Sequence, residues 1–367
     1  MSFLATLEEE QHDLENQAQE MFKPKEIQLK TKVKYIPFNI ASRKQIAERL
    51  EELGWKPTKF TDKGNVIVSE EILDTINMKE AKMFSRYFLL QKRTGLIKAW
   101  IEACQDDDKV RGRVMTLRTI TGRMAHNSPN MAQVPAVYSP YGKECRSLWT
   151  VSNPDTHVLI GTDASGLELR CLAHYMNDPD FTNEVLNGDV HTANMKAAGL
   201  TDRDQAKTFI YAFLYGAGPA KIGKVVGGSA KEGQQLITQF LRNMPRLKEL
   251  RENVVEASQT GTIKALDGRL LHIRADYASL NTLLQGAGAI ICKQWLVHIT
   301  ERIRKLGVDA KLVASIHDEY QFEVAKKDAT KFGQITKDAM KETEKTLNIK
   351  CPLDCEYKIG TTWSETH

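Results

Sequence analysis

The chain has 367 residues, 41% of them hydrophobic, and a formal net charge of +4 at pH 7. This length and composition exclude a disordered protein and are typical of a folded protein with roughly two or three lobes. No apolar run approaches the roughly 20 residues that a membrane helix needs, and the first residues, MSFLATLEEEQ, become charged too early for a signal peptide. We therefore expect a soluble intracellular protein with no membrane association, whose mildly basic balance is compatible with an anionic partner.

The cysteines are scattered along the chain, and only Cys351 and Cys355 lie close together. No histidine cluster stands beside this pair, which argues against a zinc site. We expect reduced thiols, as in an intracellular protein.

Helical patterns dominate the first hundred residues. An amphipathic helix is expected over 3–22, ending before Pro24, and further helical patterning covers 42–53 and 69–103, each opening at a serine N-cap. Between the first two helices lies a short basic connection, which contains Lys23, Lys25, Lys30, Lys32 and Lys34.

The pattern changes from about residue 110. Short β-like runs at 113–117 and 157–161 alternate with turn-rich segments, residues 180–258 return to helical patterns, and a last strand is expected over 351–359. This order indicates one sheet domain that is interrupted by a helical insertion.

The segment Ser315 to Tyr320 reads SIHDEY and lies between two apolar β-like runs. A short acidic turn can simply be a solvated hairpin tip. If the turn is buried instead, its carboxylates need a cation or another partner to replace the hydration that they lose. A second carboxylate, Asp163, follows the apolar run Val158-Leu-Ile where the strand passes into a helix, and there it can also serve only as an N-cap.

Aspartates at two strand ends of one sheet could together bind two divalent cations ~3.5–4 Å apart, the arrangement used in two-metal phosphoryl transfer. Such a site lacks histidine and cysteine ligands, and it therefore suits Mg²⁺ better than Zn²⁺.

A third segment, RDQAKTFIYAFLYGAG at 203–218, supplies positive charge. On a helix, one stripe would contain Arg203, Lys207, Tyr211 and Tyr215, with apolar residues on the opposite face. Cations suit a triphosphate and aromatic rings suit stacking on a base. The alternative is a surface helix with solvated cations and half-buried tyrosines.

The segments DASGLELR, RDQAKTFIYAFLYGAG and SIHDEY resemble, in this order, motifs A, B and C of family A (polymerase I-like) DNA polymerases. TGRMAHNSPNMAQVP, SPYGKECR, LNGDVHT, LDGRLLHIR and LNTLLQGAGA resemble the branch formed by replicative polymerases of T-odd bacteriophages. The likeness covers roughly residues 38–367. It implies an α+β right-hand fold with an antiparallel-sheet palm, helical fingers and a helical thumb. The implied division is thumb 1–110, palm 111–177, fingers 178–278 and a second palm segment 279–367.

The resemblance implies template-directed addition of dNTPs to a primer 3′-OH, with two Mg²⁺ ions for which Mn²⁺ can substitute. The implied catalytic residues are Asp163, Asp318 and Lys207, with Asp163, Asp318 and the Ala164 carbonyl as metal ligands. The implied dNTP-binding residues are Arg203, Lys207, Tyr211, His191 and Glu168, and the implied DNA-binding residues are Arg123, Tyr215, Asn281, Gln285 and His317.

Two acidic residues bear on sugar specificity and on metal binding. Glu168 resembles the residue that closes the ribose pocket against a 2′-hydroxyl, by sterics and by holding Tyr211. The role of Glu319 stays open, because the second acid of motif C is often dispensable for metal binding in this family.

Two parts of the family pattern are missing from the sequence. Polymerases of this branch carry a 3′–5′ exonuclease, and we find no candidate acid cluster for one before residue 110. The connection 23–37 is also too short for the thumb insertion that binds thioredoxin in the branch prototype. We therefore expect a polymerase-only chain that binds primer-template DNA and dNTPs without thioredoxin. It would work in the host-cell cytoplasm if phage-encoded, and a separate exonuclease subunit or other replisome proteins would be partners if the enzyme is naturally split.

Three alternatives remain. A single-subunit RNA polymerase would not need Glu168 to exclude a 2′-hydroxyl. A non-catalytic DNA-binding subunit of a split replicase would be expected to have lost Asp163 or Asp318. A metal-dependent nuclease would have no use for the cationic helix.

Overall fold

The computed structural model describes residues 2–28 and 32–367, and the chain divides into two compact units, residues 1–111 and 112–367. Among the described residues, no helix is long and apolar enough to cross a membrane.

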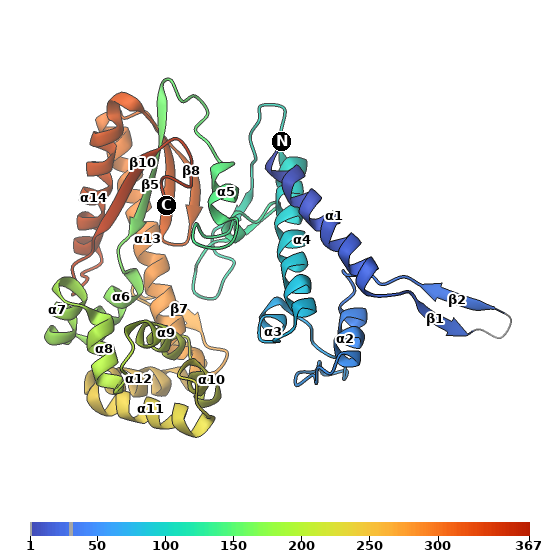
Figure 1. Ribbon diagram of the computed structural model, residues 1–367. Helices are drawn as coiled ribbons and strands as arrows, with labels where there is room; N and C mark the ends of the chain where they lie inside the picture. Colours follow the sequence, from blue (N-terminus) through green and yellow to red (C-terminus); the bar gives the residue numbers. More distant parts are fainter. Residues whose placement is uncertain (1, 29–31) are drawn as a thin grey trace. The chain divides into compact units, whose positions relative to one another are not determined.

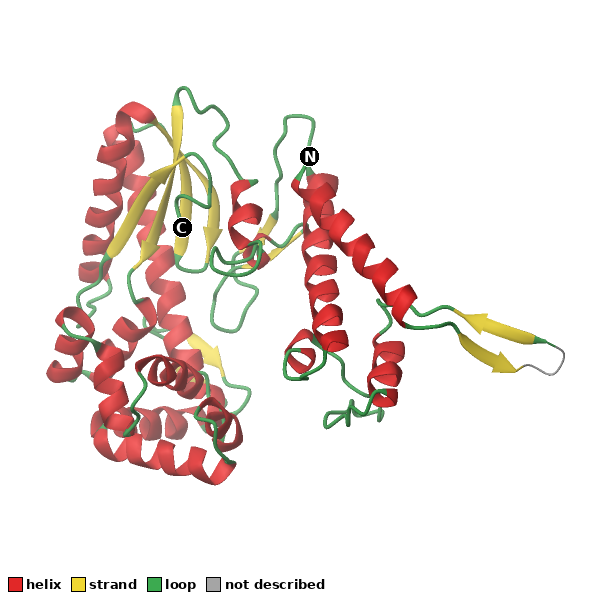
Figure 2. Cartoon of the chain, viewed as in Figure 1, coloured by secondary structure: helices red, strands yellow, loops and turns green. Residues whose placement is uncertain are grey.

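The first unit is mainly helical (Figures 1 and 2). Its elements are α1 (Phe3–Met21), β1 (Lys25–Gln28), β2 (Val33–Ile36), α2 (Arg43–Glu52), α3 (Glu70–Leu73) and α4 (Lys79–Ala103). The predicted helices 3–22 and 42–53 are confirmed, with Ser42 as the N-cap of the second. The predicted helical region 69–103 is two helices, because a turn at 74–78 separates α3 from α4.

The core of the first unit forms where α1 and α4 run antiparallel. Glu8 pairs with Lys98 at 2.8 Å, and near the other end the Tyr87 hydroxyl donates a hydrogen bond to Glu15 at 2.9 Å. Buried rings fill the interior, with centroid distances of 4.7 Å for Phe22–Phe38 and 5.7 Å for Phe38–Phe84. Aromatic burial of this kind gives the unit a core of its own.

The basic connection between α1 and α2 is a β-hairpin, which the sequence did not predict (Figure 1). Strands β1 and β2 pair antiparallel, and every residue of the two strands is exposed except the half-buried Ile36. Ile27, Val33 and Tyr35 alternate with polar neighbours, but each strand has only four residues and buries no face, so this short pattern did not lead to a predicted strand. Lys30 lies outside the described residues.

The second unit holds a four-stranded antiparallel sheet and a helical insertion. Its strands are β3 (Arg113–Met115), β4 (Ala125–Asn127), β5 (His157–Ala164), β6 (Thr262–Lys264), β7 (Leu270–His272), β8 (Ala310–Ile316), β9 (Glu319–Ala325) and β10 (Cys355–Gly360). Its α-helices are α5 (Gly142–Ser147), α6 (Leu167–Met176), α7 (Pro179–Asn187), α8 (Val190–Ala198), α9 (Arg203–Leu214), α10 (Pro219–Val225), α11 (Ala230–Asn243), α12 (Pro245–Ser258), α13 (Ser279–Leu306) and α14 (Ala329–Thr346).

The sheet has the strand order β10-β5-β9-β8, so the central strand β5 lies between strands that come much later in the chain. Helix α14 packs against β5, β9 and β10, and α13 packs against α14 (Figure 1). The buried Trp295 of α13 donates its indole N–H to the Thr336 carbonyl of α14 at 2.8 Å. One side of the sheet is therefore closed by two long helices.

The last strand begins later than the predicted 351–359, at Cys355. Pro352 has no N–H for a strand ladder, and the N–H of Leu353 donates instead to the Glu344 side chain at 2.8 Å. The predicted helical stretch 180–258 is confirmed as α7–α12. In its core the rings of Phe209 and Phe240 meet edge to face at 5.0 Å.

Candidate active site

The carboxylates of Asp163 and Asp318 are brought to one end of the sheet. Asp163 lies near the end of β5, and Asp318 lies in the two-residue loop between β8 and β9. The N–H of Ala164 donates to the Asp318 carbonyl at 3.1 Å, which ties the loop to the end of β5. His317, the first residue of this loop, has φ of 56°, the left-handed conformation that a two-residue hairpin loop requires. The acidic turn is thus both a hairpin tip and the neighbour of a second aspartate.

The surroundings of Asp163 disfavour its ionised form. Its side chain is solvent-accessible, yet loss of hydration, followed by repulsion from Asp318 and Glu319, raises the pKa of Asp163 to about 7. A divalent cation beside these carboxylates would reverse this effect, since an opposite charge favours the ionised form. Carboxylate and carbonyl oxygens are the ligands that Mg²⁺ prefers, so the residues present fit that ion.

Glu319 differs from its two acidic neighbours. It is buried, and it is the register partner of Asp163 across the β5–β9 ladder. Its carboxylate is hydrogen-bonded to Gln321, Trp363 and His367. The local sequence around SIHDEY gave no sign of the two distant partners, Trp363 and His367.

The stripe expected on the cationic helix is present on α9. Arg203 and Lys207 are exposed, Tyr211 is half-buried and Tyr215 is exposed at the C-cap. The opposite face is buried, with Ala206, Phe209, Ile210 and Phe213. The Asp202 side chain caps the helix by accepting hydrogen bonds from the N–H groups of residues 204 and 205.

Arg203 is held by Asp189, a residue that the sequence reasoning missed. Its Nε donates to Asp189 Oδ2 at 2.7 Å and its Nη2 donates to Oδ1 at 3.0 Å. Asp189 is also the N-cap of α8, which places His191 beside α9, where its ring centroid lies 6.2 Å from that of Tyr211. The signal was available in the segment LNGDVHT, where an aspartate directly precedes a helical pattern.

The imidazole of His191 is kept neutral by its environment. Burial, followed by the positive charges of Arg203 and Lys207, lowers the pKa of His191. Two cations and a neutral imidazole therefore gather on α8 and α9, and this arrangement attracts an anion.

A hydrogen bond connects α9 to the helix that follows the Asp163 strand. The Tyr215 hydroxyl donates to Glu168 Oε2 at 3.1 Å. The resemblance implied Tyr211 as the partner of Glu168, and the structure has Tyr215, one turn further along the same stripe, since residues four apart share a helix face. Burial raises the pKa of Glu168, and Asp318 raises it further, while Tyr215 and Arg123 act in the opposite direction. The end of the aromatic stripe on α9 is therefore bonded to α6, the helix that follows the strand with Asp163.

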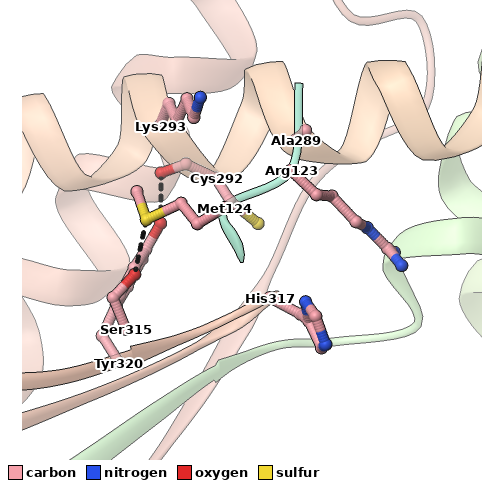
Figure 3. A pocket seen from close by; sticks show the side chains of 8 residues that line it. All are labelled: Arg123, Met124, Ala289, Cys292, Lys293, Ser315, His317 and Tyr320. Atoms are coloured by element: carbon pink, nitrogen blue, oxygen red, sulfur yellow. Dashed lines mark hydrogen bonds between the residues drawn. The ribbon is translucent and has the colours of Figure 1, made fainter. Parts of the chain in front are cut away.

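Arg123 and His317 line a small recess beside the loop between β8 and β9. The other lining residues are Met124, Ala289, Cys292, Lys293, Ser315 and Tyr320. Figure 3 shows the side chains of Arg123 and His317 extending toward the same side of this recess. Burial, followed by the charge of Arg123, lowers the pKa of His317. On the facing helix α13, Asn281 and Gln285 are hydrogen-bonded to each other at 3.0 Å.

Comparison with known proteins gives one consistent result. The family model described as DNA polymerase family A matches residues 5–365. The DNA-directed DNA polymerases of Enterobacteria phage T3 and Escherichia phage T7 are 40% and 39% identical to this chain, each over 92% of it and 54% of the relative. The chain thus spans about half the length of these relatives.

A solved structure has the same fold. It is described as the POL domain of Pol1 from M. smegmatis in complex with DNA primer-template and dNTP. The likeness covers 99% of this chain and 67% of the other, with a TM-score of 0.84 and 19% identity. The predicted α+β right-hand polymerase fold is confirmed.

Proposed function

Since this chain belongs to DNA polymerase family A, we propose that it catalyses template-directed DNA synthesis, adding dNTPs to the 3′-OH of a primer. The observation that carries the proposal is the 3.1 Å hydrogen bond between Tyr215 and Glu168. It bonds the C-terminal end of the cationic helix α9 to α6, the helix that directly follows β5 and Asp163, and so supports a site in which a triphosphate and a primer terminus could meet. We assign residues 1–110 to the thumb, 111–177 and 279–367 to the palm, and 178–278 to the fingers.

In this proposal Asp163, Asp318 and the Ala164 carbonyl hold two Mg²⁺ ions. When bound, these ions would lower the pKa of the primer hydroxyl and stabilise the charge on the triphosphate, and Mn²⁺ could supply the same chemistry. Asp163 would then be ionised, since a neighbouring positive charge favours the carboxylate and offsets the burial and repulsion that raise its pKa.

The residues of α8 and α9 would bind and orient the nucleotide. Arg203 and Lys207 bind the phosphates, and Lys207 stabilises charge on the pyrophosphate as it leaves. His191 donates a hydrogen bond to the triphosphate. The ring of Tyr211 packs on the incoming sugar and base, and Glu168 closes the space that a 2′-hydroxyl would occupy.

The remaining residues would bind the primer-template. Arg123, Asn281 and Gln285 donate hydrogen bonds to the minor-groove acceptors that all correct base pairs share. Tyr215 lies beside the templating base, and His317 lies near the primer terminus. The bond from the 3′-oxygen to the α-phosphorus forms as the bond to the pyrophosphate oxygen breaks, in line.

Primer extension with and without Mg²⁺ tests the proposal. Extension should be abolished in Asp163→Asn and in Asp318→Asn, while binding of primer-template DNA stays close to that of the wild type. Asp309→Asn is a matched control, because Asp309 precedes β8 and hydrogen-bonds to His157 at 3.3 Å. Appreciable Mg²⁺-dependent extension by either active-site variant would refute the site assignment.

The same assay separates the alternative functions. A non-catalytic DNA-binding subunit would bind the primer-template without extending it, an RNA polymerase would prefer ribonucleotides, and a nuclease would shorten the primer. We further propose that these 367 residues synthesise without proofreading. A mismatched primer should then be extended slowly and not trimmed, unless a separate exonuclease subunit is added.

A further inference from the structure

Glu319 contacts a segment that no part of the proposed mechanism uses. Its side chain is only 5% exposed, in a unit where a buried ionised carboxylate would be unfavourable without partners. Oε1 accepts hydrogen bonds from Trp363 Nε1 and from Gln321 Nε2, both at 2.6 Å. Oε2 lies 2.7 Å from Nδ1 of His367. Both oxygens are therefore engaged by protein groups.

Two of these partners, Trp363 and His367, belong to residues 361–367, which lie against the sheet, while Gln321 is on β9 itself. We call residues 361–367 the docked segment. The Val151 N–H donates to the Thr361 carbonyl and the Trp363 N–H donates to the Trp149 carbonyl, each at 2.9 Å. The Thr366 hydroxyl donates to Gln321 Oε1 at 2.7 Å. The docked segment is thus bonded both to the strand β9 and to the chain that leads into β5.

The packing around this contact leaves no free space. A Cβ added to Gly161, on the central strand, would clash with the Thr366 carbonyl oxygen and with the Gln321 side chain. The guanidinium of Arg146 lies 4.3 Å from the ring centroid of Trp363, and its Nη1 is 3.9 Å from Glu319 Oε2. The buried carboxylate is thus surrounded by hydrogen-bond donors and a guanidinium, the partners that a buried carboxylate needs.

Glu319 lies next to both aspartates of the candidate site. It directly follows Asp318, and across the ladder it is the register partner of Asp163. Any shift of Glu319 would therefore move the loop that carries Asp318 relative to the strand that carries Asp163. Displacements of about 1 Å in such a site can cost about 10²-fold in rate.

We propose that Glu319 is a positioning residue that anchors the docked segment to β9, and that this anchor holds Asp318 in place beside Asp163. The inference rests on the proposed polymerase function for its kinetic consequence. The anchor itself is a structural claim that can be measured without DNA synthesis.

The test compares three variants. Glu319→Gln removes the charge, and Trp363→Phe removes the indole N–H donor while keeping an aromatic ring. Trp295→Phe is the control, because it removes a buried indole N–H, bonded to Thr336 at 2.8 Å, that does not contact Glu319. Each variant is measured alone, and the two tryptophan variants are also measured in combination with Glu319→Gln. The measurements are thermal unfolding in EDTA, Mn²⁺ binding by electron paramagnetic resonance and single-turnover primer extension.

We expect Glu319→Gln and Trp363→Phe each to slow primer extension by about 10- to 100-fold, and the double variant to be within about threefold of the slower single variant. Their effects on the melting temperature should likewise not add. Trp295→Phe should lower the melting temperature, leave extension within about threefold of the wild type, and add to Glu319→Gln.

Two results would overturn the proposal. If Glu319→Gln weakens Mn²⁺ binding while Trp363→Phe behaves as the wild type, Glu319 acts as a metal ligand. If the losses in the double variant multiply, the docked segment and Glu319 act independently. If the wild type extends no primer, the proposed function fails, but the unfolding and Mn²⁺ measurements still decide whether the anchor exists.

Discussion

Replacing Asp163 by asparagine should stabilise the metal-free protein even though it abolishes synthesis. In the wild type, loss of hydration, followed by repulsion from Asp318 and Glu319, raises the pKa of the Asp163 carboxyl from 3.8 to about 7. A neutral asparagine of nearly the same shape removes that repulsion. Sites tuned for a ligand are commonly unfavourable for stability when the ligand is absent.

The size of the effect follows from the pKa. A change from 3.8 to about 7 corresponds to at most about 4 kcal/mol at high pH. Because the Asp163 side chain is solvent-accessible, screening reduces this to about 1–2 kcal/mol. For a unit of this size we expect a rise of about 2–8 °C in the melting temperature.

The pH dependence has a definite sign. The folded state binds the Asp163 proton more tightly than the unfolded state, so the stability from this group is present below pH 3.8 and is lost as the pH rises through about 7. The advantage of Asp163→Asn should therefore be largest near pH 8 and should shrink toward pH 4.

Thermal unfolding in EDTA at pH 8 and at pH 5 measures this difference, with Asp309→Asn as the control that should show no gain. Adding Mg²⁺ should stabilise the wild type and leave Asp163→Asn nearly unchanged, since ligand binding to the folded state raises stability. A variant that melts at or below the wild-type temperature at pH 8 in EDTA would refute the reasoning.

Three further predictions concern nucleotide and DNA binding. Tyr211→Phe should reduce dideoxynucleotide termination in a sequencing ladder, because the phenol hydroxyl can replace the missing 3′-hydroxyl; equal termination would contradict this placement of the ring. Asp189→Asn should keep the helix cap but release Arg203 from its ion pair, lowering the KM for dNTP by about two- to fivefold in steady-state kinetics; a higher KM would mean that Asp189 orients Arg203 for binding. Lys32→Ala with Lys34→Ala, on the exposed hairpin β1–β2, should reduce the log–log salt dependence of DNA affinity by up to about 2 and shorten products in the presence of a DNA trap; an unchanged salt slope would remove the hairpin from the DNA contact.

Local sequence patterns predicted those site residues whose placement depends on a single helix or strand. The stripe on α9 follows from helical periodicity, and the strand-end placement of Asp163 follows from an apolar run that stops at a polar residue. The hairpin β1–β2 was missed although Ile27, Val33 and Tyr35 alternate with polar residues, because its strands are only four residues long and bury no face.

The partners of Glu319 lie beyond any local pattern. Trp363 is 44 residues from Glu319 in the chain, and Thr366 is 45 residues from Gln321. Contacts of this kind depend on sheet register and on how the docked segment packs, which periodicity does not encode. The break between α3 and α4 was also missed, since residues 74–78 contain no glycine or proline to mark it.

The strand order of the sheet also has a consequence for how the protein folds. The central strand β5 pairs with β10, where Thr162 hydrogen-bonds to Glu356 across 194 residues of chain, while the helices α7–α12 between them make mostly local contacts. Contacts between distant residues form slowly, and domains fold as they leave the ribosome. We expect the helical insertion to fold early during synthesis, while β5 stays without β9 and β10 until residues 319–325 and 355–360 have emerged. The strand that carries Asp163 would then be the part of the sheet most exposed to misassociation before β9 and β10 pair with it.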